Sequence, residues 1–390
     1  MYTVLLVIIY IAFISLGLPD SILGAAWPSM YGELAVPVSG AGVISMIIAA
    51  GTIVSSLMSG RVVRRFGTGV VTLCSVGLTA VALLGFSVSC AFWMLCLWAV
   101  PFGLGAGSVD AALNHFVATH YQSRHMNWLH SFWGVGATAG PMVMGLCLAN
   151  GLSWSVGYRV IGWAQLALVL ILSVSMPLWK RARRETDAAE DRQAKPIGIR
   201  QALRLPGAKP TMLAFFCYCG LEATTGLWLA SYLVLVHGVP EEQAAQFASI
   251  FFLGITAGRM LGGLVSGRLG NQRMVRIGEM LILCGVAVFF IPAGAALLPV
   301  GIVLLGLGCA PVFPALLHET PVSFGRRNAQ SLMGMQMASA YVGTTLVPPL
   351  FGWIANAAGA GLLPYGMLLL AGGLMVFTQV VTRRKAMPGK

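Results

Sequence analysis

Charged residues are scarce in this chain, and acidic ones most of all. Only 12 Asp and Glu stand against 24 Lys and Arg in 390 residues, and 57% of the residues are hydrophobic. Soluble globular proteins carry about a quarter charged residues, against 9% here. The composition therefore excludes a soluble protein and predicts an all-α integral membrane protein with many spans.

Several motifs of other protein classes are also missing. No G-x-x-x-x-G-K-[ST] segment occurs, which excludes a phosphate-binding loop for an ATP-driven motor in this chain. The 8 cysteines lack the spacing of a zinc site, so we expect them to be small packing residues. The first apolar segment lacks a basic start and is too long for a signal peptide, so it should remain as a membrane helix. We therefore expect no enzyme, and no cofactor or metal beyond a coupling ion.

Twelve apolar segments reach the roughly 20 helical residues that a hydrocarbon core of about 30 Å requires. They span residues 3–28, 38–60, 69–89, 92–118, 127–150, 156–179, 210–236, 243–266, 275–294, 297–318, 328–353 and 362–382.

Lys and Arg are absent from every second loop. Of the 24, 22 lie in or beside alternate loops, at the central connection and at the C-terminal end, and only Arg159 and Arg259 belong to apolar segments. Because cytoplasmic loops carry the excess of positive residues, both termini are predicted to face the cytoplasm of a multi-pass cell-membrane protein, with a bacterial inner membrane expected. The net charge of +12 is thus a topology signal, and nucleic acid is not an expected partner.

The only long polar stretch divides the chain into two halves. It predicts a six-helix bundle over residues 1–179, a cytoplasmic linker over 180–209 and a second bundle over 210–390. The halves are similar: Ser59-Gly60-Arg61 recurs as Ser266-Gly267-Arg268, and Gly17-Leu18 recurs as Gly220-Leu221. Gly103-x-Gly105 returns as Gly306-x-Gly308, and Gly136, Pro141 and Gly145 return as Gly343, Pro348 and Gly352. Offsets of 203 to 207 at four places indicate a duplicated transporter unit.

Three acids lie well inside apolar segments: Asp20, Asp110 and Glu222. An ionisable group at membrane depth costs several kcal/mol unless it has partners or faces water, so each is a functional candidate, with a structural hydrogen-bonded carboxylate as the alternative. Asp110 and Asn114 are four residues apart and share one helical face. We expect Asp20 and Asp110 to bind the coupling cation, which is either a proton or sodium held by an oxygen cluster.

A hydroxylated substrate needs amides, carboxylates and flat aromatic faces. The embedded candidates are Asn114, Asn127, His130, Trp133, Glu222, Trp228, Gln336 and Tyr341. Trp27, Trp154 and Trp179 lie near helix ends and are expected to be interface anchors. Arg259 should pair with an acid on a neighbouring helix, with the substrate as the alternative partner. Gly134, Gly136 and Gly140 should let another helix approach closely.

Over its whole length the chain resembles the major facilitator superfamily. SGRVVRRFG (59–67) and SGRLGNQR (266–273) are similar to its signature loop, which implies structural or gating roles for Arg61 and Arg268. The resemblance is greatest to the fucose-permease-like group of sugar:cation symporters, which includes the sodium-dependent glucose transporter-like proteins. It is carried by GLPDSILGAAWP (17–28), GLGAGSVDAALNHF (103–116), NWLHSFWGVGATAGP (127–141), GLEATTGLWLASYL (220–233) and FGRRNAQSLMGMQMASAYVG (324–343).

This resemblance implies a secondary active transporter that moves a neutral sugar or polyol with a cation, by rocking two halves around a site near the bilayer midplane. Its expected partners are a small-molecule substrate and the lipid bilayer, and the expected state is a monomer. A proton-driven exporter of drugs or metabolites, and a non-transporting nutrient sensor on the same scaffold, are the alternatives.

Overall fold

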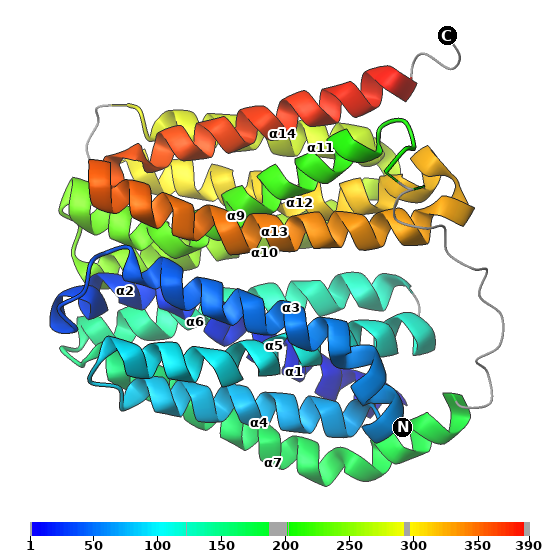
Figure 1. The fold of residues 1–390 in the computed structure, drawn as a ribbon, viewed down its shortest axis with the longest axis horizontal. Helices are drawn as coiled ribbons and strands as arrows, with labels where there is room; N and C mark the ends of the chain where they lie inside the picture. Colours follow the sequence, from blue (N-terminus) through cyan, green and yellow to red (C-terminus); the bar gives the residue numbers. More distant parts are fainter. Residues whose placement is uncertain (1, 122, 187–200, 202, 292–296, 386–390) are drawn as a thin grey trace. The chain divides into compact units, whose positions relative to one another are not determined.

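The structure is a computed structural model that describes residues 2–121, 123–186, 201, 203–291 and 297–385 (Figure 1). Its contacts divide the chain into two compact units: unit 1 comprises residues 1–191 and 229–252, and unit 2 comprises residues 192–228 and 253–390. The predicted bundles 1–179 and 210–390 remain predictions. Most of the predicted linker 180–209 lies outside the described residues.

The described elements are helical. Unit 1 contains α1 (Tyr2–Asp20), α2 (Ile22–Glu33), α3 (Gly40–Phe66), α4 (Thr68–Ser87), α5 (Phe92–His120), α6 (Ser123–Ala149) and α7 (Trp154–Thr186). Two helices, α9 (Ala208–His237) and α10 (Glu241–Leu269), have parts in both units. Unit 2 also contains α11 (Asn271–Val288), α12 (Leu298–Phe324), α13 (Arg326–Ala358), the short 3-10 helix η2 (Ala360–Leu362) and α14 (Leu363–Lys385).

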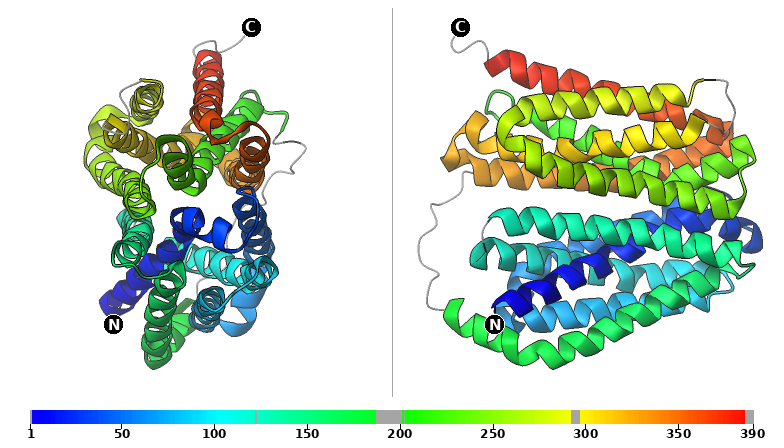
Figure 2. Two further views of the ribbon diagram at one scale, coloured as in Figure 1. Left: turned by 90° about the vertical axis from the view of Figure 1, so that its left-hand side faces the viewer. Right: turned by 180° about the vertical axis from the view of Figure 1, so that it is seen from behind.

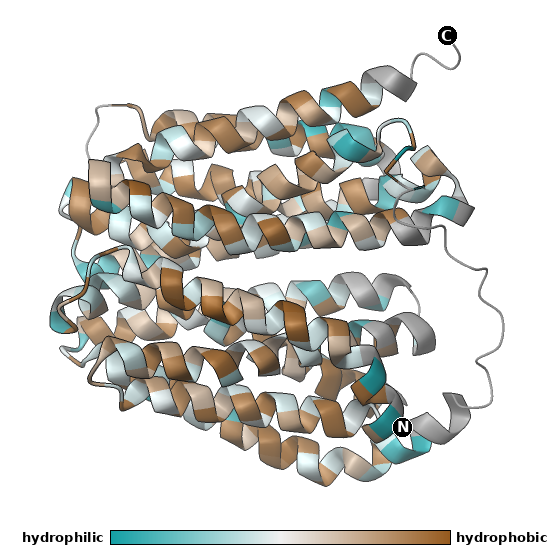
Figure 3. Cartoon of the chain, in the orientation of Figure 1, coloured by the Kyte–Doolittle hydropathy of each residue, from teal (hydrophilic) through white to brown (hydrophobic). Residues whose placement is uncertain are grey.

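These helices correspond to the twelve predicted segments, the first of which is divided into α1 and α2 (Figure 2). Within the described residues, ten helical stretches are long and apolar enough to cross a membrane, and Figure 3 shows the apolar residues along them. The two other helices are less apolar: α11 carries Arg273, Arg276 and Glu279 in its 18 residues, and α13 begins with two arginines. The all-α membrane fold is confirmed.

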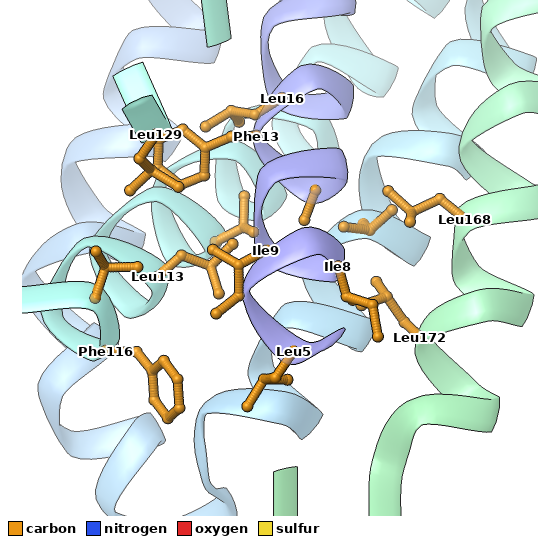
Figure 4. Packing of buried hydrophobic residues seen from close by; sticks show 14 of the residues in the cluster. Leu5, Ile8, Ile9, Phe13, Leu16, Leu113, Phe116, Leu129, Leu168 and Leu172 are labelled. Atoms are coloured by element: carbon orange, nitrogen blue, oxygen red, sulfur yellow. The ribbon is translucent and has the colours of Figure 1, made fainter. Parts of the chain in front are cut away.

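The core of unit 1 forms around α1. Leu5, Ile9 and Phe13 of that helix are at most 1% exposed, and Figure 4 shows them among apolar side chains of α5, α6 and α7, such as Leu113 and Leu172. Burying a leucine-sized side chain contributes about 1.5–3 kcal/mol. In the bilayer this driving force is replaced by packing, so close fit decides how α1 is held.

Glycines at repeat-related positions make matching contacts in the two units. A methyl group placed on Gly51 of α3 would lie 3.1 Å from the Cα of Gly103 on α5, and one on Gly254 of α10 would lie 3.1 Å from the Cα of Gly306 on α12. Each pair marks a place where two helices meet backbone to backbone. The sequence repeat is therefore also a repeat of helix crossings.

Three tryptophans that were expected to anchor helix ends at the membrane surface are instead buried in the protein. Trp27, Trp154 and Trp179 are 0%, 3% and 4% exposed. The indole N–H of Trp27 donates to the carbonyl of Val38, and that of Trp154 donates to Glu33 at 2.6 Å. The expectation was wrong because a segment end can be covered by a neighbouring helix, which no local pattern reveals.

Candidate functional site

The first membrane segment is broken next to its acid. α1 ends at Asp20, Ser21 is a turn residue, and α2 begins directly after it. Pro19 has no N–H, so the carbonyl of Ser15, four residues earlier, loses its helical donor. The buried amide of Gln165 on α7 donates to that carbonyl instead. The break thus places Asp20 at a helix end, and a neighbouring helix satisfies the carbonyl that the proline leaves free.

α1 and α6 cross with their backbones in contact. A methyl group on Gly17 would clash with the carbonyl oxygen of Trp133, and one on Gly136 would lie 2.9 Å from the backbone nitrogen of Leu18. Gly140 is similarly close to α1. This confirms the close approach predicted from Gly136 and Gly140. Because no side-chain layer separates the two helices, their spacing near Asp20 is fixed by backbone contact.

Asp20 and Trp133 are joined across this crossing. The indole Nε1–H of Trp133 donates to Oδ2 of Asp20 at 2.9 Å. Asp20 is exposed, although Pro19 and Ser21 beside it are buried, and Trp133 is half-buried. The predicted coupling acid and a predicted substrate residue therefore form one polar unit with open space beside it.

α5 supplies the second acid. Asn114 donates its amide Nδ2–H to Oδ1 of Asp110 at 2.9 Å, which confirms that the two side chains share a helical face. Both are half-buried. Asp20 and Asp110 lie on α1 and α5, two helices of unit 1 that contact each other. The structure thus brings both predicted coupling residues into one region of unit 1.

The acid of unit 2 is paired. Glu222 on α9 lies 3.7 Å from the guanidinium of Arg259 on α10, and their side chains are 17% and 15% exposed. This confirms the expectation that Arg259 pairs with an acid on another helix. The pair cancels both charges, so the part of the membrane segment that carries Glu222 has no net charge from these two groups.

Two other substrate candidates are buried with their polar groups engaged. Trp228 is 1% exposed and donates its indole N–H to the carbonyl of Pro348 at 2.8 Å. Gln336 is 0% exposed, and its amide exchanges hydrogen bonds with the hydroxyl of Thr320. Both side chains have their polar groups bonded within unit 2, and their predicted substrate roles remain predictions.

The remaining candidates have varied surroundings. His130 and Tyr341 are half-buried, and the His130 ring meets the edge of Phe13 at 5.9 Å between centroids. Arg61 is exposed. The side chains of Asn127 and Arg268 lie outside the described residues, so their predicted roles remain predictions.

Several polar residues were missed by sequence reasoning. Gln165 was overlooked because a single amide in an apolar segment is a weak signal. Glu279 of α11 is 3% exposed and accepts a hydrogen bond from Thr378 at 2.5 Å; its place inside the predicted segment 275–294 was the available sign. It lines a cavity of about 460 Å³ in unit 2 together with residues of α9, α12 and α14.

A further missed group lies where α5 ends and α6 begins. The hydroxyl of Tyr10 is 2.9 Å from Nδ1 of His125, and the ring of Tyr121 lies against the same histidine. Burial, together with the neighbouring Tyr10, raises the pKa of Tyr121 to about 12. Tyr121 therefore stays neutral at physiological pH, and its ring packs against His125.

A bundle of membrane helices that holds hydrogen-bonded carboxylates inside apolar segments defines the class of polytopic membrane transporters. Within the described residues, no group of three or more His, Cys, Asp or Glu is arranged to hold a metal ion. The pattern of the Major Facilitator Superfamily matches residues 9–318. The chain belongs to this superfamily.

Related proteins carry different names and substrates. The chain is 24% identical to the glucose/mannose transporter GlcP of Bacillus subtilis over 78% of this chain and 76% of that protein. It is 23% identical to the probable sulfoacetate transporter SauU of Cupriavidus necator over 90% and 87%. Its match to Bypass of stop codon protein 6 of Saccharomyces cerevisiae is 24% identical over 66% of this chain, and spans 56% of that protein.

Among solved structures, a point mutant of the nucleoside transporter NupG superposes with a TM-score of 0.76 at 15% identity, over 96% of this chain and 98% of that one. At this identity the likeness shows the fold alone. None of these matches singles out the fucose-permease-like group, so that finer assignment remains a prediction.

Proposed function

We propose that this protein is a secondary active transporter that carries a neutral sugar or related polyol together with a cation, either a proton or sodium, by alternating access. The observation that carries the proposal is the pair of neighbouring acids in unit 1. Asp20 is bonded to an indole and Asp110 to an amide, and among the described residues neither has a recorded ion pair. An ionised carboxylate inside a membrane segment is costly unless it has a partner of opposite charge or faces water. A bound cation supplies such a partner.

The nature of the substrate is inferred from the groups beside these acids. Asn114 can donate to and accept from hydroxyl groups, and the ring of Trp133 suits the apolar face of a sugar. Arg259 is already compensated by Glu222, which disfavours an anionic substrate. The name of the relative GlcP, a glucose/mannose transporter, supports hexoses as the first compounds to test.

Uptake into proteoliposomes tests the proposal. Radiolabelled glucose or mannose is offered outside while a pH gradient and a sodium gradient are imposed separately. We expect one of the two gradients to drive accumulation above the equilibrium level. Efflux driven by an inward proton gradient would instead indicate an exporter, and saturable sugar binding without any transport would indicate a sensor.

We further propose that both termini face the cytoplasm of the inner membrane and that the transporter acts as a monomer. Cys90 offers a native probe, because it is exposed in the connection between α4 and α5, a loop that the charge pattern places outside. An impermeant maleimide added outside cells should label the wild type and leave Cys90→Ser much less labelled. Equal labelling of the two from outside would reverse the topology.

A further inference from the structure

The backbones of Asp20 and Trp133 are held together more tightly than their side chains. Gly17, three residues before Asp20, touches the carbonyl oxygen of Trp133 itself, and the hydroxyl of Ser21 donates to the carbonyl of Ala137 at 2.7 Å. The two helices therefore cannot slide past each other at this point without breaking both contacts. What remains free to change between Asp20 and Trp133 is side-chain rotation.

The hydrogen bond between these side chains depends on the charge of Asp20. An indole N–H is a donor only, and its bond to an ionised carboxylate is roughly twice as strong as one between neutral groups. A proton or a sodium ion on the carboxyl group lowers its negative charge and so weakens the bond from Trp133. The cation and the indole therefore each weaken the binding of the other to Asp20.

Few other charged groups act on this pair among the described residues. α5 faces Asp20 with Asp110, and α6 brings His130, whose ring lies against Phe13. α7 meets the break in α1 through the neutral amide of Gln165. Glu33, at the far end of α2, is bonded by Trp154, and α4 contains no Asp, Glu, Lys, Arg or His. Among these described groups, Asp110 is the carboxylate whose charge acts on Asp20.

We propose that Trp133 is the positioning residue through which cation binding at Asp20 controls substrate affinity. With Asp20 ionised, the indole is held against the carboxylate. With a cation on Asp20 this hydrogen bond weakens, and the ring turns its face to the apolar side of the sugar. This inference rests on the proposed function for its second half, while the competition between cation and indole stands without it.

The first measurement needs no substrate. Infrared difference spectra are recorded on the full-length protein in proteoliposomes while protons or sodium are titrated. The carboxyl band of Asp20 is identified by its loss in Asp20→Asn, and its change with cation concentration is measured. Trp133→Phe keeps a ring and loses the N–H. Because the competing donor is gone, the half-saturating cation concentration should fall about tenfold, equivalent to one pH unit for a proton. Trp128→Phe, which changes a 50% exposed ring on the same helix, should leave it unchanged.

The second measurement is glucose exchange at equal concentrations, with the cation absent or saturating. In the wild type the half-saturating glucose concentration should differ between the two conditions. In Trp133→Phe the ratio should collapse to within about twofold, because a phenyl ring cannot donate a hydrogen bond to Asp20 in either condition. Trp133→Gln, whose amide nitrogen is as many bonds from Cα as Nε1, should keep the wild-type cation titration and lose glucose affinity.

An unchanged carboxyl titration in Trp133→Phe would overturn the inference, whatever happens to transport. So would a wild-type ratio of glucose affinities in that variant. If Trp133→Phe shifts the carboxyl titration but the wild-type protein never exchanges sugars, the proposed substrate is refuted and the link between Asp20 and Trp133 is retained.

Discussion

The three predicted membrane acids are held differently in the two units. In unit 1, Asp20 and Asp110 are near each other and are bonded to neutral donors, an indole and an amide. In unit 2, Glu222 is bonded to a cation of the protein itself, Arg259. An acid that is already neutralised has little to gain from a bound ion, whereas two uncompensated acids gain much. The comparison teaches that two similar sets of helices can hold one acid in an ion pair and others by neutral donors alone.

The largest expected effect is on coupling in unit 1. Asp110→Asn removes one of the two negative charges but keeps the shape and the bond with Asn114, so the site should no longer require a cation. Gradient-driven accumulation should be abolished while exchange at equal sugar concentrations continues. Radiolabelled uptake and counterflow measure both, with Glu242→Gln at the start of α10 as a control. Normal accumulation in Asp110→Asn would make Asp110 a structural group.

The next largest effect is expected at the close helix crossings, one of which lies within each unit. Gly136→Ala would place a methyl group against the backbone of Ile14, and Gly343→Ala would place one 2.5 Å from the carbonyl oxygen of Phe216. Each should cost about 3 kcal/mol of stability, because the backbones must separate. Gly77→Ala, where nothing lies within 4 Å, is the control. Thermal denaturation in detergent measures all three, and tolerance of Gly343→Ala alone would show that the crossings differ.

A smaller effect is expected from breaking the ion pair of unit 2. Arg259→Gln leaves the Glu222 carboxylate without the guanidinium that it pairs with, and should destabilise the protein by about 2 kcal/mol. This loss is smaller than for a fully buried pair, because both side chains retain some exposure. The double variant Glu222→Gln/Arg259→Gln should recover part of that loss. Denaturation of the two single variants and the double variant gives the coupling energy. A purely additive double variant would contradict the pairing.

The smallest effect compares the two tryptophans. Trp228→Phe removes the N–H that donates a hydrogen bond to the carbonyl of Pro348, and should cost about 1 kcal/mol of stability. It should leave the cation dependence of uptake unchanged, unlike Trp133→Phe. A change in the cation dependence caused by Trp228→Phe would mean that the second unit also takes part in ion coupling.

Most of the membrane helices could be predicted from the sequence, because membrane segments are local runs of apolar residues. The shared face of Asp110 and Asn114 follows from helical geometry, and the glycines of α6 predicted a close crossing. The contacts that define the site could not be predicted in this way. Trp133 is 113 residues from its acceptor Asp20, and Gln165 is 150 residues from Ser15. Such pairs depend on which helices are neighbours, and no local periodicity encodes that.

Helix limits were also only partly predictable. α3 continues to Phe66 and α13 extends from Arg326 to Ala358, beyond the predicted segments 38–60 and 328–353. The prediction counted only residues that suit hydrocarbon. A helix does not need lipid in order to continue, since its backbone hydrogen bonds are internal.

The backbone crossing of α1 and α6 also bears on how such a transporter can diversify. Gly17 and Gly136 bring the two helices together without using any large side chain. The exposed Asp20 and half-buried Asn114 and Trp133 are therefore not required for that crossing to form. Under the proposed function, substitutions at these three positions change the ligand at little cost to assembly. A helix crossing of this kind tolerates substitutions that change specificity, so proteins that share it can come to bind different substrates while keeping one architecture.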